Sequence, residues 1–202
     1  MMNHKYLVCL GTGKRVQDDG LVLSNPNSKS QALLRADYYE KEFLVRKDLP
    51  GIYRYSNWLP INRILKGSSA PVTYHGKALG KYLGLPNLYI TFSGYWPEKG
   101  VTMFTGTFKE CEAYSVCSRF PKESSTALVV ASAGNTARAF MKVGAENGIP
   151  IIVVVPEKYI NNLWYTGDMN PCVKVVAAGG DSDYFDAITL AEQICRSGFH
   201  SE

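Results

Sequence analysis

Three apolar runs in the second half of the chain restrict its fold more than any other feature. They cover residues 127–131, 151–155 and 173–177, of which only the last contains a charged residue, Lys174, and helix-like segments lie between and after them. Strands that are apolar along both faces and alternate with helices are typical of a parallel sheet covered on both sides. With residues 88–92 added as a further strand, residues 87–196 predict an α/β unit with a four-stranded parallel sheet and helices on both faces.

The helices of this unit carry recognisable boundary signals. We expect helices at 77–83, 108–118 and 135–146, the last of these stopped by Asn147-Gly148. Either Asp181 or Ser182 is expected to cap a final helix that runs to about Arg196.

A joint of small residues at 67–71, Gly-Ser-Ser-Ala-Pro, suggests a domain crossing. We therefore divide the chain into residues 1–70, with N-terminal strands and turns that belong to an incomplete larger domain, and residues 71–202, which form the α/β small domain.

Composition excludes several classes of function. The 202 residues carry a net charge of +4 without blocks of like charge, so nucleic-acid binding is not expected. Five cysteines without a Cys-x-x-Cys pair argue against a disulfide framework and fit a reducing cytoplasm. The three histidines show no metal-ligand spacing, and no apolar stretch is long enough to cross a bilayer. We expect no metal, no membrane segment and no nucleic-acid partner.

The turn after the apolar run 127–131 reads Ser-Ala-Gly-Asn-Thr and opens a helix. Gly134 lets a ligand approach the backbone, and free N–H groups at a helix N-terminus favour a carboxylate or phosphate. Ser132 and Thr136 offer hydroxyls, and Asn135 offers an amide donor. The same residue types are also common helix caps, so both interpretations stay open from these residues alone.

A second helix start carries Lys109, in the sequence Thr-Gly-Thr-Phe-Lys. The helix dipole disfavours a cation there, but its positive field can also activate a lysine amine as a nucleophile. A lysine in this position is otherwise a solvated surface residue. Arg138 and Lys142, four residues apart, could hold an anion or could form a solvated stripe on a helix.

Together the two segments resemble the fold-type II pyridoxal phosphate enzymes, the group of tryptophan synthase β-subunits, threonine synthases and cysteine synthases. Residues 105–109 are similar to their Ser-Phe-Lys motif, residues 132–136 to their Ser-x-Gly-Asn-Thr loop, and 49–55 and 84–89 to threonine synthase segments. The resemblance implies pyridoxal 5'-phosphate as cofactor. It implies that Lys109 forms the Schiff base, that Asn135 bonds the phenolic oxygen, and that Ser132, Gly134 and Thr136 hold the substrate carboxylate.

Departures from the threonine synthase pattern, such as Thr-Phe-Lys-Glu-Cys at 107–111 and the insertion at 92–98, look like the archaeal cysteate synthases of coenzyme M biosynthesis. This resemblance implies β-replacement on O-phospho-L-serine by sulfite, giving L-cysteate and phosphate. Threonine synthase, acting on O-phosphohomoserine, is the alternative enzyme. A non-catalytic remnant or half-enzyme binding module is the alternative of another class.

Members of this family carry a glycine-rich phosphate loop in their C-terminal half, and no Gly-Gly-Gly-Thr-Gly-like loop occurs in these 202 residues. We therefore expect a truncated chain that binds the cofactor weakly and does not turn over alone. Its expected partners are a small anionic amino acid, sulfite, and either further copies of itself or the C-terminal half.

Overall fold

The computed structural model describes residues 4–22, 25, 28–29, 32–165 and 169–197. Its strands are β1 (Lys5–Cys9), β2 (Arg15–Val16), β3 (Leu34–Tyr38), β4 (Val72–His75), β5 (Tyr89–Phe92), β6 (Tyr95–Trp96), β7 (Val101–Thr102), β8 (Leu128–Ala131), β9 (Ile151–Pro156) and β10 (Val173–Ala178). Its helices are α1 (Lys77–Leu83), α2 (Lys109–Cys117), α3 (Asn135–Asn147) and α4 (Tyr184–Arg196), with 3-10 turns η1 (Gly51–Trp58), η2 (Pro97–Lys99) and η3 (Glu157–Asn162).

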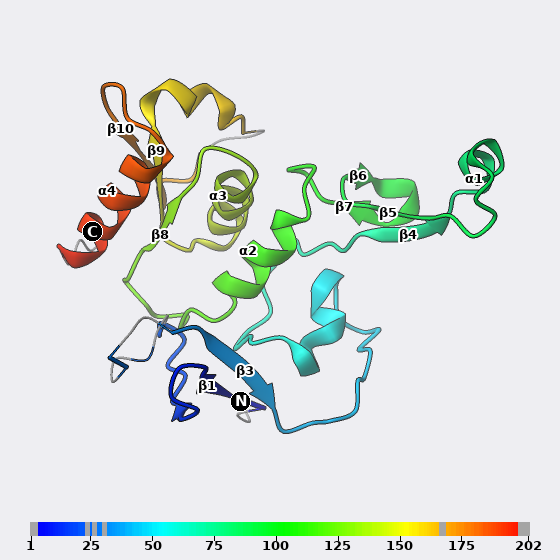
Figure 1. The fold of residues 1–202 in the computed structure, drawn as a ribbon, viewed down its shortest axis with the longest axis horizontal. Helices are drawn as coiled ribbons and strands as arrows, with labels where there is room; N and C mark the ends of the chain where they lie inside the picture. The colour runs from blue at the N-terminus through cyan, green and yellow to red at the C-terminus, as the bar shows by residue number, and fades with distance from the viewer. Residues whose placement is uncertain (1–3, 23–24, 26–27, 30–31, 166–168, 198–202) are drawn as a thin grey trace.

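The three apolar runs form one parallel sheet in the order β10-β9-β8. Every residue of the central strand β9 is buried, as expected for a strand covered on both faces. Alternate side chains of β9 enter two clusters: Ile151 and Val153 pack with α2 and α3, and Ile152 and Val154 pack with α4. Figure 1 shows α3 and α4 on opposite sides of the strands. The prediction of a parallel sheet with helices on both faces is therefore confirmed.

The prediction of a fourth parallel strand is wrong. Residues 89–92 form strand β5 but pair antiparallel with β4 in a separate two-stranded sheet. The hydroxyls of Thr73 and Thr91 lie 2.9 Å apart, and the rings of His75 and Tyr89 stack with centroids 5.1 Å apart. These polar and aromatic side chains suit a sheet with solvent-exposed faces, whereas a strand inside a covered parallel sheet needs apolar residues on both sides.

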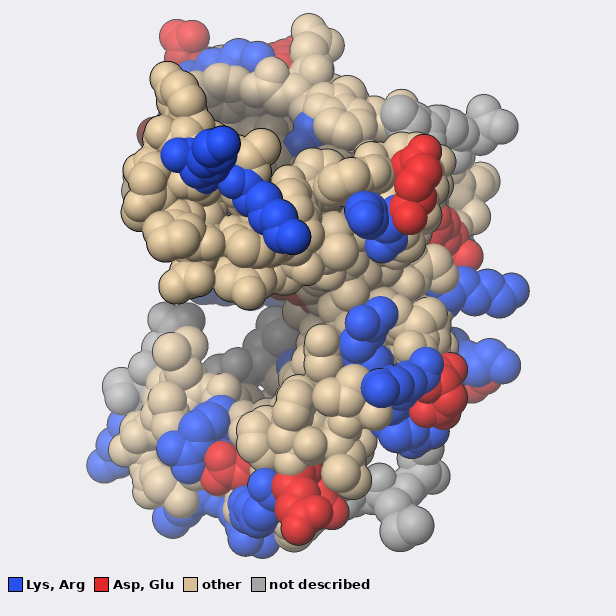
Figure 2. Space-filling model, turned by 90° about the vertical axis from the view of Figure 1, so that its right-hand side faces the viewer, with Lys and Arg blue, Asp and Glu red and all other residues tan. Residues whose placement is uncertain are grey.

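Strands β4 to β7 and helix α1 form an arm that projects from the rest of the molecule (Figure 1). Seen from the end of this arm in Figure 2, the upper part of the surface is mostly uncharged, and charged side chains gather on the lower part. Exposed aromatic residues of the arm include Tyr82, Tyr89 and Tyr95.

The N-terminal strands make a small antiparallel sheet, β2-β1-β3, which is tied to the end of α2 by buried charges. The Lys5 ammonium lies 3.3 Å from the carboxylate of Asp18, and Arg119 reaches the same carboxylate at 3.0 Å. Lys5 also donates to Asn62 at 2.7 Å. These contacts join the first 20 residues to the α/β unit.

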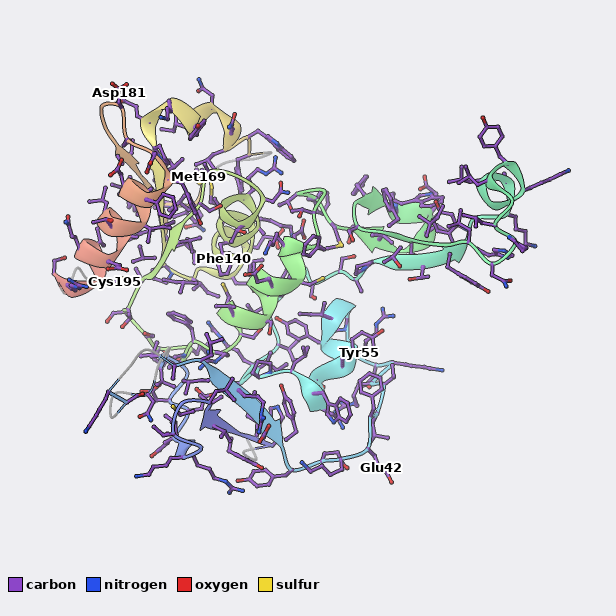
Figure 3. All side chains as sticks on the ribbon, viewed as in Figure 1. Glu42, Tyr55, Phe140, Met169, Asp181 and Cys195 are labelled. Carbon is purple, nitrogen blue, oxygen red and sulfur yellow. The ribbon has the colours of Figure 1, made fainter. Side chains whose placement is uncertain are left out.

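The aromatic segment at η1 contributes only part of its side chains to the core. Tyr53 is fully buried and packs edge-on against Tyr114 of α2. Tyr55 is instead exposed and stacks on Phe43, with ring centroids 5.6 Å apart. Phe140 of α3, labelled with Tyr55 in Figure 3, is buried in the core.

The last helix is capped by Asp183, not by Asp181 or Ser182. The Asp183 carboxylate accepts from the backbone N–H groups of Phe185 and Asp186, and the Asp183 N–H donates to the Asp186 carboxylate. This reciprocal pair is a capping box, and it needs the acidic residue three positions after the cap. Only Asp183 among the three candidates has that spacing.

Candidate functional site

Both predicted motifs lie at helix starts on the same face of the parallel sheet. Lys109 is the first residue of α2 and Asn135 is the first residue of α3. The two helices pack against each other in one core cluster, with Ala113 and Tyr114 of α2 near Phe140 and Met141 of α3. Among the described residues, no hydrogen bond or ion pair joins the Lys109 and Asn135 side chains directly.

The Lys109 side chain is one third exposed and lies along its own helix. Its Nζ atom donates to the carboxylate of Glu112 at 2.6 Å, and its backbone N–H donates to the Thr107 hydroxyl. An exposed ion pair at this spacing is weak, on the order of 0.2–1 kcal/mol, so a ligand can displace Glu112 from the amine.

The start of α3 lacks a side-chain cap because the N-cap residue is Gly134. A Cβ added to Gly134 would meet no atom within 4 Å, so the backbone borders open space. The Ser132 hydroxyl accepts from the Gly134 N–H. Among the described residues no side chain caps the first turn of α3, so its N–H groups can bind an anion, whereas the first turn of α4 is capped by Asp183.

The orientation of the Asn135 amide is set by Arg138, whose guanidinium donates to the amide oxygen. Since the oxygen of the amide is occupied, its NH₂ group is left to donate elsewhere. Asn135 itself is exposed at the helix start. This arrangement gives the donor that a phenolate oxygen of a cofactor would need.

A buried polar network behind Lys109 was missed by sequence reasoning. Glu110, whose side chain is 1% exposed, accepts from both the N–H and the hydroxyl of Thr105, at 2.6 and 2.8 Å. Its other carboxylate oxygen lies 3.5 Å from Nζ of Lys142. Glu110 therefore holds the turn 105–109 to α3. In the sequence it looked only like an acidic residue that follows the usual preference of a helix N-terminus.

Lys142 makes further bonds inside this network. It donates to the Tyr114 hydroxyl at 2.8 Å and to Glu146 at 3.0 Å, and Tyr114 also donates to Glu146. Burial raises the pKa of Tyr114, and the nearby carboxylates of Glu146 and Glu110 add to the effect. Tyr114 thus remains a neutral phenol and a hydrogen-bond donor across the physiological range.

A pocket of about 220 Å³ opens beside α3. We call it the α3 pocket, and it is lined by Phe104, Thr105, Arg138, Lys142, Glu146, Trp164 and Tyr165. Lys142 is buried, so the interpretation of Arg138 and Lys142 as a solvated stripe is wrong. The pocket includes Thr105 of the first motif, and it is linked to the second motif through Arg138, which donates to Asn135.

Two other expectations concern metals and membranes. Within the described ranges, no group of three or more His, Cys, Asp or Glu side chains is placed to bind a metal ion. His200 lies outside those ranges. None of the helices described is both long and apolar enough to cross a bilayer.

The fold and the site define a class of protein: a parallel α/β unit whose helix N-termini present a lysine amine, an oriented amide and uncapped N–H groups. Ligands of such sheets bind beyond the carboxyl ends of the strands, next to helix starts.

Comparison with curated proteins narrows this class, although no protein-family model matches the chain. The chain is similar to curated cysteate synthases of methanogenic archaea. It is 42% identical to the one from Methanocorpusculum labreanum in an alignment that covers 100% of this chain and 48% of the relative. It is 43% identical to those from Methanoculleus marisnigri and Methanococcoides burtonii, over 96% and 98% of this chain and 44% and 47% of the relatives. The chain thus spans about half the length of the curated relatives it matches.

Proposed function

We propose that this chain supplies the lysine-bearing part of a pyridoxal-phosphate-dependent enzyme that converts O-phospho-L-serine and sulfite into L-cysteate and phosphate. The observation that carries the proposal is the similarity to cysteate synthases at about 40% identity along nearly the whole chain. The proposal extends to association of this chain with the remaining part of such an enzyme, or with further copies of itself.

The chemical groups of the site match those that pyridoxal phosphate needs. Pyridoxal phosphate supplies an aldehyde for an amine and an electron sink for the bond changes at the substrate's carbons. Lys109 offers the amine at the start of α2, and Asn135 offers its amide NH₂ as a donor, since its amide oxygen accepts from Arg138. Glu112 must release the Lys109 amine first, and the ion pair between them is exposed and therefore easily exchanged.

The substrate carboxylate is assigned to the start of α3. The uncapped N–H groups there, with the positive end of the helix dipole, favour an anion by about 0.3–1 kcal/mol. The hydroxyls of Ser132 and Thr136 flank the same turn and can add hydrogen bonds, while Gly134 leaves room for close approach. These residues orient the amino acid so that its α-hydrogen can face Lys109.

In the reaction, Nζ of Lys109 takes the proton from the α-carbon of phosphoserine and returns it at the end. The bond between the β-carbon and the phosphate oxygen breaks, and phosphate leaves with the electron pair. A sulfur–carbon bond forms from the lone pair of sulfite. No oxidant or reductant is needed, because the β-carbon exchanges one nucleophile for another.

An activity assay with matched variants tests the proposal. The chain is mixed with a separately produced C-terminal part of the Methanocorpusculum labreanum enzyme, then given cofactor, O-phosphoserine and sulfite. We expect cysteate and phosphate in equal amounts, loss of both in Lys109→Ala, and no loss in Lys174→Ala, which changes an exposed lysine on β10. Threonine formed from O-phosphohomoserine, with no cysteate from phosphoserine, would favour the threonine synthase alternative. Two parts that associate without any turnover would favour the binding-module alternative.

A further inference from the structure

The α3 pocket has aromatic walls and two cationic side chains, and none of these residues is assigned to cofactor or substrate in the proposed reaction. Phe104, Trp164 and Tyr165 provide the apolar lining, and Arg138 and Lys142 project from successive turns of α3. Its volume is about 220 Å³. A small ligand with a few polar atoms fits such a space.

The two cations differ in their partners. Lys142 is held by the carboxylates of Glu110 and Glu146, at 3.5 and 3.0 Å. Arg138 takes part in none of the ion pairs found among the described residues. Both carboxylates, including that of Glu146 in the pocket wall, lie against Lys142, whereas the Arg138 guanidinium has no ion pair to a carboxylate of the described part of the chain.

The guanidinium of Arg138 is also held in one orientation and is partly removed from water. Its central carbon lies 4.1 Å from the ring centroid of Trp164, and stacking of this kind fixes the plane of the guanidinium. Its Nε atom is buried and has no hydrogen-bond partner among the described residues. Burial lowers the pKa of Arg138, which is the sign of a charged group held away from water.

An oriented guanidinium with free N–H donors matches the geometry of a planar pair of oxygens on phosphate, sulfite or carboxylate. We propose that the α3 pocket is the oxyanion subsite of the enzyme, with Arg138 as its main ligand, and that it takes the sulfite or the phosphate group of the reaction. This inference rests on the proposed function for the identity of the anion. The hydrogen bond from Arg138 to Asn135 places the subsite next to the residue assigned to the cofactor.

The subsite is tested by anion titration of the 202-residue chain without cofactor, because the cofactor carries a phosphate of its own. Sodium sulfite, sodium phosphate and O-phosphoserine are titrated by calorimetry against sodium chloride at matched ionic strength. The Nε–H resonance of Arg138, assigned by nitrogen-15 NMR, is followed in the same titrations. We expect saturable binding of the oxyanions and a shift of this resonance, with no response to chloride.

Variants then assign the binding to Arg138. Arg138→Gln should weaken oxyanion binding by about 10–100-fold, and Arg138→Lys by a smaller factor, because a lysine cannot form the paired bonds. Arg196→Gln, the same change at an arginine that is 80% exposed on α4, should leave the affinity within about 2-fold. Circular dichroism confirms that each variant is folded.

The outcomes separate the possible ligands and the two proposals. Tighter binding of sulfite assigns the subsite to the incoming nucleophile, and tighter binding of phosphate and phosphoserine assigns it to the leaving group. Wild-type chain that binds no oxyanion, an unshifted Arg138 resonance, or an unchanged affinity in Arg138→Gln would overturn the inference. Since no turnover is measured, Arg138-dependent oxyanion binding would stand even if no cysteate were made. Cysteate formation without such binding would remove the subsite alone.

Discussion

The buried Glu110 should be a main support of the turn that presents Lys109, and its replacement by alanine tests this. The change removes the acceptor of two bonds from Thr105, at 2.6 and 2.8 Å, and one of the two carboxylates near Lys142. Removing one partner of a buried ion pair costs about 3–5 kcal/mol. Lys142 keeps Glu146 at 3.0 Å, which lowers this cost, but the buried N–H of Thr105 loses its acceptor, which adds about 1–3 kcal/mol.

We therefore expect Glu110→Ala to lower the free energy of unfolding by about 3–5 kcal/mol, measured by urea unfolding followed by circular dichroism. With a slope of about 2 kcal/mol per molar, the midpoint falls by about 1.5–2.5 M. Glu110→Gln keeps one oxygen for Thr105 and should cost about 1–2 kcal/mol.

Glu112→Ala is the matched control, since it removes the same residue type from the same helix. The Glu112 side chain is 43% exposed and its ion pair with Lys109 is solvated, so the loss of stability should stay within about 1 kcal/mol. If Glu110→Ala and Glu112→Ala had equal stability, the buried network would not hold the turn, and the reasoning would be refuted.

Three further predictions concern the rest of the fold. Asp183→Ala removes the capping box of α4 and should cost about 1–2 kcal/mol in the same urea assay, with no change in slope. Burial raises the pKa of Asp18, but the bond and charge of Arg119 outweigh it and leave the pKa below its usual value. The stabilisation from Asp18 is therefore complete above about pH 4 and lost as the pH falls through the lower folded value, so melting scans from pH 5 to pH 2 should show a steeper loss in wild type than in Asp18→Asn. Cys195 is exposed, whereas Cys117 is buried and burial raises its pKa to about 12, so a thiol reagent should modify Cys195 in the folded chain and reach Cys117 only in urea; equal rates would contradict this packing.

The parallel sheet could be predicted from sequence because its strands are apolar runs, interrupted only by Lys174 in β10, and because helices alternate with them. The partner of strand β5 could not be predicted, because its mixture of threonine and aromatic residues suits an antiparallel sheet as well as the edge of a parallel one. Its pairing with β4 depends on contacts between residues that are distant in the chain. The cap at Asp183 required weighing the residue three positions later, which distinguishes it from Asp181.

Within the site, the sequence predicted which residue types stand at the two helix starts but not what lies behind them. The burial of Lys142 results from α2 packing on α3, a contact that spacing along one helix does not reveal. Arg138 has the same ambiguity: only the stacking on Trp164 and the bond to Asn135 distinguish it from a solvated arginine. The roles of Lys109, Asn135, Ser132, Gly134 and Thr136 toward a cofactor and substrate remain the proposal made here.

The most direct measurement of the central claim is the site of covalent attachment of pyridoxal phosphate. The chain is incubated with the cofactor, reduced with borohydride, and digested for peptide mapping. We predict that the label concentrates on Lys109, that Glu112→Gln increases its rate by freeing the amine, and that Lys109→Ala abolishes it. Label spread over the exposed lysines, with the Lys109 peptide unmodified, would contradict the account.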